Sequence, residues 1–133
     1  MKRPVTSIYL AGPMLGHAYF NFPAFLDAAE QLRAAGYRVA NPADVDIAGG
    51  FDFRECPWGS REELEEQGFD RTAALLDDFR MISEVDAVVL LPGWEQSTGA
   101  RAEKAVATAF GLPVYLLPNG SVLKNQLVPV EAT

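Results

Sequence analysis

Short apolar runs alternate with longer segments in which apolar residues recur at helical spacing, and this alternation restricts the possible folds most strongly. The apolar runs cover residues 5–11, 86–91 and 113–117, and residues 37–41 form a short, more polar second strand. The helical segments between them cover residues 21–36, 60–83 and 99–110. Strands that are buried on both faces of a parallel sheet read as continuous apolar runs. The order therefore predicts an α/β fold, a single-domain Rossmann- or flavodoxin-like parallel sheet of four to five strands with helices on both faces.

Length, charge and cysteine content limit the class of protein. The 133 residues predict one domain that spans 1–133. The net charge of −7 argues against nucleic-acid binding, which needs a basic face, but permits a small anion held by backbone amides. The only cysteine, Cys56, cannot form an intramolecular disulfide and is typical of a reducing compartment. Because there is neither a signal-peptide pattern nor an apolar run of about 18 residues, we expect a cytoplasmic protein without a membrane partner.

Residues 92–103 join the third apolar run to the last helical segment and form the strongest candidate site. Ser97 or Thr98 is suited to cap the helix, and Gly99 lets a ligand approach the backbone closely. Free N–H groups and the positive end of the helix dipole attract anions at such a helix start. Glu103 falls within the first two turns, which suggests a phosphate or sugar held against a catalytic acid. The alternative is structural, because the dipole alone favours a glutamate there.

Ligands of parallel α/β sheets bind where the strands end. The strand ends expected here are Tyr9–Met14, Asn41–Asp44, Pro92–Gly99 and Pro118–Ser121. Tyr9 is either a core aromatic or a phenol that points into the cleft, and Asp78 is either near the cleft or a surface carboxylate. The first loop, 12–16, lacks the glycine patterns of dinucleotide and P-loop sites, which disfavours both kinds of site. We expect no cofactor and no metal.

Residues 45–60 are expected to form a long loop, and such loops in compact domains are usually functional or mobile. The segment contains Phe51, Phe53 and Trp58. These aromatic side chains could stack on a base, form a local core or contact another subunit. The sequence leaves the three alternatives open.

Five strings of residues together resemble one family. They are Tyr9-Leu10-Ala11-Gly12-Pro13-Met14, Asn21-Phe22-Pro23-Ala24-Phe25, Asn41-Pro42-Ala43-Asp44, Asp86-Ala87-Val88-Val89-Leu90-Leu91-Pro92-Gly93-Trp94 and Ser97-x-Gly99-x-x-x-Glu103. Over residues 5–118 the chain resembles the small phage and bacterial proteins grouped as DUF4406. These proteins are similar to the nucleoside 2-deoxyribosyltransferase superfamily, which includes the 2'-deoxynucleoside 5'-phosphate N-hydrolases.

The resemblance implies a retaining, glycosidase-like scheme. Glu103 matches the glutamate that attacks the anomeric carbon of a nucleoside. Asp78 matches the aspartate that acts on the leaving base, and Tyr9 matches the tyrosine that positions the nucleophile. The residues that the resemblance suggests for substrate binding are Gly12, Met14, Asp44, Trp94, Ser97, Thr98, Gly99, Asn119 and Ser121.

Ser97 favours one subclass of this superfamily. Transferases that use free nucleosides carry an aspartate at this position, whereas the 5'-phosphate hydrolases carry a serine, and a carboxylate would repel a phosphate. Those hydrolases also carry an arginine in the first loop, where this chain has Met14 and Leu15. Arg101 either replaces that cation or points to solvent. The resemblance further implies a homodimer or higher homo-oligomer, in which C-terminal residues complete a neighbour's pocket.

Three functions are therefore open. The leading hypothesis is an enzyme that cleaves the N-glycosidic bond of a (deoxy)nucleoside 5'-monophosphate and releases the free base. The second is transfer of deoxyribose between bases by the same chemistry. The third is a nucleotide-binding module without catalysis. In all three the partner is a small nucleotide or nucleoside.

Overall fold

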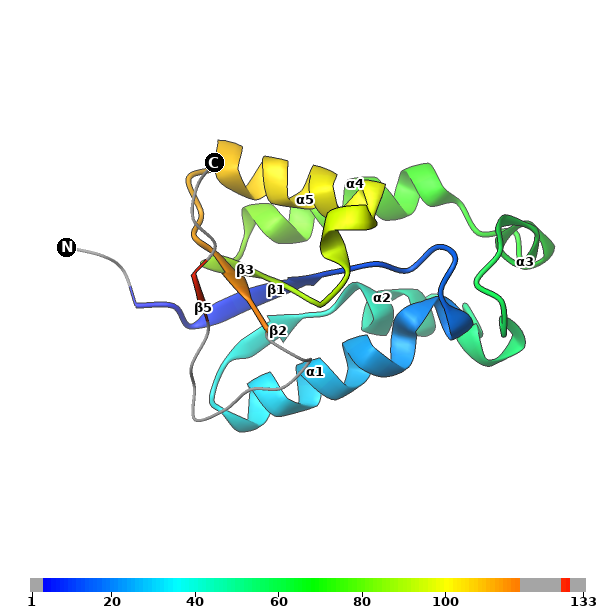
Figure 1. The fold of residues 1–133 in the computed structure, drawn as a ribbon, viewed down its shortest axis with the longest axis horizontal. Coiled ribbons are helices and arrows are strands. Elements are labelled where there is room, and N and C mark those ends of the chain that lie inside the picture. Colours follow the sequence, from blue (N-terminus) through cyan, green and yellow to red (C-terminus); the bar gives the residue numbers. More distant parts are fainter. Residues whose placement is uncertain (1–3, 118–127, 130–133) are drawn as a thin grey trace.

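The computed structural model describes residues 4–117 and 128–129, which form a five-stranded sheet between two layers of helices (Figure 1). The strands, in chain order, are β1 (Ser7–Ala11), β2 (Arg38–Ala40), β3 (Ala87–Leu90), β4 (Val114–Leu116) and β5 (Val128–Pro129). They lie side by side in the order β2-β1-β3-β4-β5. The first four are parallel, and β5 pairs antiparallel with β4 at the edge. The predicted α/β sheet of four to five strands is confirmed, with an antiparallel edge strand.

Helices cover both faces of this sheet, as predicted. The helices α1 (Phe22–Ala34) and α2 (Pro42–Ala48) lie on one face, and α4 (Arg71–Ser83) and α5 (Thr98–Ala109) pack together on the other (Figure 1). Shorter elements join them: η1 (Ala18–Asn21), η2 (Phe53–Glu55), α3 (Arg61–Glu66) and η3 (Trp94–Gln96). Within the described ranges, no helix has both the length and the apolar character that a membrane span requires.

The central strands β1 and β3 are completely buried, and their side chains alternate between two cores. Ile8 and Leu10 pack in the core that includes α1. Tyr9 and Ala11 pack in the core that includes residues of α4 and α5. The side chain of Tyr9 therefore points toward the layer that carries Asp78 and Glu103.

Several helix boundaries follow the sequence signals. A serine followed three residues later by a glutamate predicts a capping box, and Ser60 and Glu63 form one at the start of α3. The glycine in the helical segment 60–83 predicts a break, and Gly68 separates α3 from α4 with a φ of +68°, which residues with a side chain rarely adopt. Ser97, rather than Thr98, caps α5, because its Oγ accepts a hydrogen bond from the N–H of Ala100 at 3.1 Å.

The expectation of one long loop over 45–60 is wrong, because α2 occupies its first part and η2 lies further on. Asn41 caps α2 by accepting a hydrogen bond from the N–H of Ala43 at 3.1 Å, and Pro42 takes the first helical position. Asparagine followed by proline is a helix-start signal, since proline has no N–H to lose there.

Two local sequence signals predict the helices wrongly. Asparagine before a helical segment predicts an N-cap at Asn21, but this residue has a φ of +60°, and its side chain donates a hydrogen bond to the Pro13 carbonyl at 2.9 Å instead of capping α1. Helical spacing predicts Leu75 and Leu76 in the buried stripe of α4, yet they are 38% and 60% exposed. This helix is anchored in the core through Ile82, while Leu75 borders a cavity.

Candidate active site

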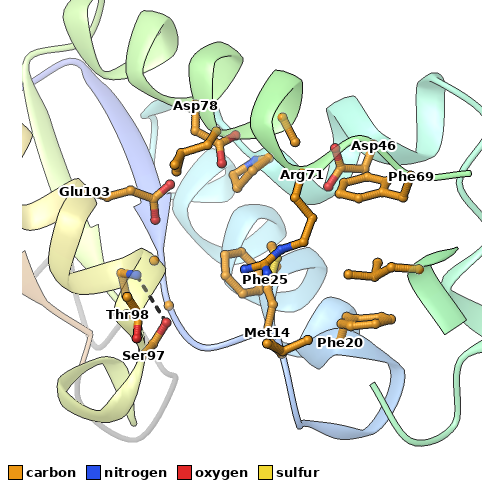
Figure 2. A pocket seen from close by; sticks show the side chains of 18 of the residues that line it. Met14, Phe20, Phe25, Asp46, Phe69, Arg71, Asp78, Ser97, Thr98 and Glu103 are labelled. Atoms are coloured by element: carbon orange, nitrogen blue, oxygen red, sulfur yellow. Dashed lines mark hydrogen bonds between the residues drawn. The ribbon is translucent and has the colours of Figure 1, made fainter. Parts of the chain in front are cut away.

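A cavity of about 410 Å³ lies beyond the carboxyl ends of β1 and β3 (Figure 2). The loop after β1, the helix α2 and the first turns of α4 and α5 surround it. Its charged lining consists of Asp46, Asp78, Glu103 and Arg71. Parallel α/β sheets bind ligands at this edge, so the cavity is the candidate site.

Glu103 and Tyr9 form a hydrogen-bonded pair at the inner end of this site. Tyr9 is fully buried on β1, Glu103 is only 6% exposed on α5, and Tyr9 Oη donates to Glu103 Oε2. Burial, and then the negative charge of Glu103, raise the pKa of the Tyr9 phenol well above its usual value. The phenol therefore stays protonated and acts as a donor. Of the two alternatives for Tyr9, the structure shows the core aromatic: the side chain is fully buried and does not line the cavity, and its hydroxyl contacts Glu103, which does.

Asp78, on α4, lines the same cavity as Glu103 and lies close enough to interact with it (Figure 2). Burial, and then repulsion by Asp46, raise the pKa of Asp78 from 3.8 to about 7. Burial, and then repulsion by Asp78, raise the pKa of Glu103, and a side-chain interaction with Asp78 adds to this shift, while the hydrogen bond from Tyr9 opposes it. Because the two carboxyl groups repel each other, the loss of both protons is disfavoured. The pair can thus offer an anion and a proton donor at one place.

The raised pKa of Asp78 predicts how stability depends on pH. Between about pH 4 and pH 7 the folded protein holds a proton that the unfolded chain has released, so the free energy of unfolding falls as pH rises through this window. We expect Asp78→Asn to be more stable than the wild type at pH 8 by about 1–2 kcal/mol, because it removes a buried charge. At pH 4, where the wild-type carboxyl is protonated, the difference should largely disappear. Thermal unfolding at both pH values measures this.

The control for this prediction is Glu66→Gln, which removes an exposed carboxylate at the end of α3. Its free energy of unfolding should lie within about 0.5 kcal/mol of the wild-type value at both pH values. If Asp78→Asn has the same stability difference from the wild type at pH 4 and pH 8, the raised pKa is refuted.

Asp46, on α2, is a third carboxylate of the cavity, and it was not identified from the sequence. Burial, followed by repulsion by Asp77, raises its pKa from 3.8 to about 6. Pro42 also lines the cavity, four residues earlier on the same helix face. The helix-start signal at Asn41 and Pro42 could therefore have brought Asp46 into consideration.

Residues from two predicted loops form another part of the lining. Gly12, Met14, Ser97, Thr98 and Gly99 all border the cavity. Gly12 also lies against Leu91, the residue that follows β3: an added Cβ would come within 2.8 Å of the Leu91 Cβ, so a larger residue would push these segments apart. Because Ser97 Oγ uses an oxygen lone pair to cap α5, its hydroxyl hydrogen remains able to donate to a ligand.

Aromatic residues line the side of the cavity that lies away from Glu103. Phe51 contacts Phe20, Phe22 and Phe69, with ring centroids 5.2–5.8 Å apart. All four rings also border the cavity. For Phe51 the structure therefore favours the local core, which borders the cavity. Trp58, by contrast, is 78% exposed and does not reach the cavity.

Some residues expected to bind substrate are not brought to the cavity. Asp44 forms an ion pair with Arg33 at 2.9 Å, because its side chain leaves α2 on another face than Asp46. Trp94 packs beside α5, with the Lys104 ammonium 5.7 Å from its ring centroid. Asn119 and Ser121 lie outside the described residues.

The cationic side chain of the cavity is Arg71, whereas the sequence had suggested Arg101. Arg101 is exposed on α5 and is not part of the cavity lining. Arg71, at the first position of α4, extends into the cavity instead (Figure 2). No spacing signal pointed to it, because only the tertiary packing of α4 brings it opposite the loop after β1.

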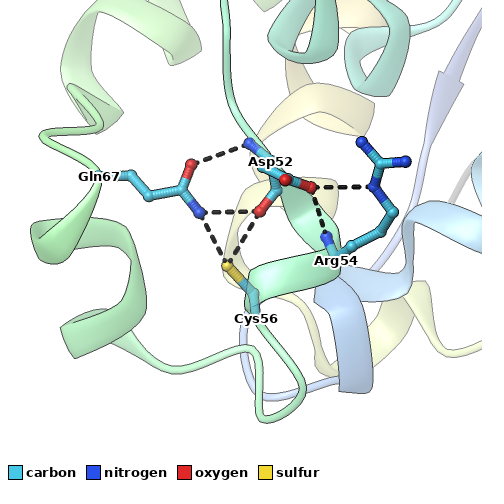
Figure 3. Close-up of polar contacts among 4 residues, drawn as sticks. All are labelled: Asp52, Arg54, Cys56 and Gln67. Carbon is cyan, nitrogen blue, oxygen red and sulfur yellow. Dashed lines mark hydrogen bonds and ion pairs between the residues drawn. The ribbon is translucent and has the colours of Figure 1, made fainter.

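Cys56 belongs to a separate polar cluster (Figure 3). Gln67 binds the backbone of Asp52 on both sides, accepting from its N–H and donating to its carbonyl at 2.8 Å each. The Gln67 amide also donates to Cys56 Sγ at 3.3 Å. Burial raises the pKa of the Cys56 thiol. These contacts give the thiol a structural role in holding the segment before α3. Among the described residues, no three histidine, cysteine, aspartate or glutamate side chains converge as a metal site would require.

Comparison with known families agrees with this arrangement. The family described as "Domain of unknown function (DUF4406)" matches residues 6–116. The chain belongs to the DUF4406 family. This confirms the resemblance inferred from the sequence motifs, and the match includes Tyr9, Asp78 and Glu103 within one continuous region. No curated protein sequence matches this DUF4406 member.

Solved structures show the same fold. A 2-deoxyribosyltransferase from the psychrotolerant bacterium Bacillus psychrosaccharolyticus superposes with a TM-score of 0.57 at 24% identity, covering 89% of this chain and 77% of its own. BlsM superposes with a TM-score of 0.53 at 25% identity, covering 85% of this chain. The aligned region is 64% of BlsM, so this DUF4406 member spans less than two thirds of that protein. The family thus shares its fold with a 2-deoxyribosyltransferase.

Proposed function

We propose that the protein cleaves the N-glycosidic bond of a (deoxy)nucleoside 5'-monophosphate and releases the free base. The observation that carries this proposal is the pair of carboxyl groups in one cavity, Glu103 held by Tyr9 and Asp78 facing it. Two carboxyl groups in distinct protonation states are what glycoside hydrolysis requires. The shared fold with a 2-deoxyribosyltransferase supports the same chemistry.

In the first step, the ionised Glu103 attacks C1' of the sugar through Oε1. The C1'–N bond breaks, its electron pair stays on the base nitrogen, and Asp78 donates a proton to the departing base. The hydrogen bond from Tyr9 to Glu103 Oε2 orients the carboxylate and favours its ionised form.

In the second step, water attacks C1' of the sugar ester on Glu103. Asp78, now a carboxylate, accepts the water proton, and Glu103 leaves in its original form. Two inversions at C1' give net retention. If a second base replaces water, the same steps transfer deoxyribose between bases.

The opposite ends of the cavity suit the other parts of a nucleotide. The edges of Phe20, Phe51 and Phe69 offer an apolar surface for a planar base. The start of α5, with Ser97, Thr98 and Gly99, offers N–H and hydroxyl donors for a phosphate. In this arrangement C1' of the sugar lies between the two carboxyl groups.

Ser97→Asp tests the phosphate assignment. Aspartate caps helices as well as serine does, so α5 should stay intact. Its negative charge should repel the phosphate and weaken the binding of a nucleoside 5'-monophosphate about 10- to 100-fold. The affinity for the matching nucleoside should change less than about 3-fold. Titration calorimetry with both ligands measures the two effects, and equal losses for both would refute the assignment.

Time-resolved incubation with deoxynucleoside 5'-monophosphates separates the three candidate functions. Free base together with deoxyribose 5-phosphate supports hydrolysis. Base exchange that occurs only when a second base is added supports the transferase. Binding without turnover, unchanged by Glu103→Ala, supports a non-catalytic module.

The assembly and location of the protein remain predictions of the same proposal. We expect a homodimer or larger homo-oligomer in the cytoplasm, as the family resemblance implies. Light scattering of the full chain measures the subunit number. A monomer at micromolar concentration that still turns over substrate would contradict the expectation of a shared pocket.

A further inference from the structure

Arg71 is the cationic side chain of the cavity, and no other arginine or lysine among the described residues lines it. It projects from the first turn of α4 toward the middle of the cavity, where the loop after β1 and the start of α5 also lie (Figure 2). The neighbouring charges in the lining are all negative: Asp46, Asp78 and Glu103.

The guanidinium of Arg71 has no protein partner in the described part of the chain. The ion pairs there join Arg33 to Asp44 and Arg54 to Asp52. No hydrogen bond or ring contact of Arg71 accompanies them. An arginine that enters a cavity without pairing with its carboxylates keeps all its donors available for a ligand.

We propose that Arg71 binds the 5'-phosphate of the substrate and makes the site selective for nucleotides over nucleosides. This inference rests on the proposed function and adds to it the residue that recognises the phosphate. The guanidinium fork matches phosphate oxygens and can form two parallel hydrogen bonds with them. Ser97 lies on the same cavity and supplies a hydroxyl donor, so the phosphate is bound between α4 and α5.

The charge balance of the cavity supports this assignment. Without Arg71, the charged lining consists of three carboxyl groups, and Asp46 is ionised above its pKa of about 6. A phosphate dianion entering such a cavity would be repelled at short range. The loop after β1 supplies no cation, since Met14 and Leu15 occupy it. Arg71 therefore provides the compensating charge, from α4.

The test measures ligand binding in a chain that cannot turn over, so that binding is separated from catalysis. In the background of Glu103→Gln, the variants Arg71→Gln, Arg71→Lys and Arg101→Gln are titrated with dAMP, dCMP, dGMP, dTMP and the four matching deoxynucleosides. Arg101→Gln is the matched control, because it removes the same charge from an exposed position outside the cavity.

We expect Arg71→Gln to weaken binding of the monophosphates about 10- to 100-fold, the effect of losing one charge-assisted contact. Nucleoside binding should change less than about 3-fold. Arg71→Lys should retain part of the selectivity, and Arg101→Gln should stay within about 2-fold for both ligands.

The inference is overturned if Arg71→Gln weakens the binding of nucleosides and of monophosphates equally, or if it leaves monophosphate binding unchanged. It is also overturned if no monophosphate binds to the Glu103→Gln protein. Failure of the proposed function gives a different result. Suppose that monophosphate binding depends on Arg71 but the wild type releases no base. Glycosidic cleavage would then be refuted, and the phosphate site would still be supported. If substituting Arg71 does not change the rate of base release, the phosphate site is refuted and glycosidic cleavage is still supported.

Discussion

Glu103→Gln is expected to reduce base release at least about 10⁴-fold, the largest effect of any single substitution in this chain. The amide cannot form the sugar ester, because it lacks the negative charge that attacks C1'. Glutamine has the same length, and its carbonyl oxygen can still accept the hydrogen bond from Tyr9. Chromatography of the released base, followed over hours, measures the loss.

Two controls belong to this experiment. Glu95→Gln removes an exposed carboxylate from η3, close in sequence to α5 but outside the cavity, and should retain wild-type turnover. The circular dichroism and the unfolding temperature of Glu103→Gln should equal or exceed those of the wild type at pH 8, because a buried charge is lost. If the folded variant keeps more than about a tenth of the activity, Glu103 is not the nucleophile.

Asp78→Asn is expected to lower turnover about 10²- to 10⁴-fold, the usual contribution of a proton donor. Asparagine fills nearly the same space but has no acidic proton for the leaving base. The loss should shrink when the base leaves easily without protonation. Comparing dUMP with its 5-fluoro derivative, whose base is more acidic, measures this dependence, provided that pyrimidines are accepted.

The outcome of that comparison decides the role of Asp78. A smaller loss for the fluorinated nucleotide identifies Asp78 as the proton donor. An equal loss for both nucleotides contradicts that role and makes Asp78 a residue that only positions Glu103. Asp77→Asn is a useful neighbour for comparison, because Asp77 is exposed on the same helix and does not line the cavity.

The sheet and the start of α5 could be predicted because their signals are local. A continuous apolar run such as 87–90 fits only a buried strand or a short buried helix segment, and the turn residues beyond it favour the strand. Ser97 three residues before Ala100 is a local capping pattern as well. Helix geometry places Glu103 within two turns of that cap, so its location near the cavity could be predicted from the sequence.

The remaining site residues depend on tertiary packing. Asp46 is not found from the sequence, because Asn41 and Pro42 indicate the end of a strand, and that interpretation leaves 45–60 without a helix. Arg71 follows a helix break, and nothing in a linear pattern shows which loop the new helix faces. The hydrogen bond of Tyr9 spans 94 positions in the sequence, so its spacing in β1 could not distinguish a core ring from a site residue.

The most direct test of the account is to trap the sugar on the enzyme. A 2'-fluoro-2'-deoxynucleoside 5'-monophosphate slows both steps, because the fluorine disfavours the positive charge that develops on the sugar, and intact-mass spectrometry after acid quenching then detects any sugar ester. The account predicts a mass increase equal to the fluorinated sugar phosphate less one water, found on the peptide that contains Glu103. Release of the base with the protein at its unmodified mass throughout, or an adduct on another residue, would contradict it.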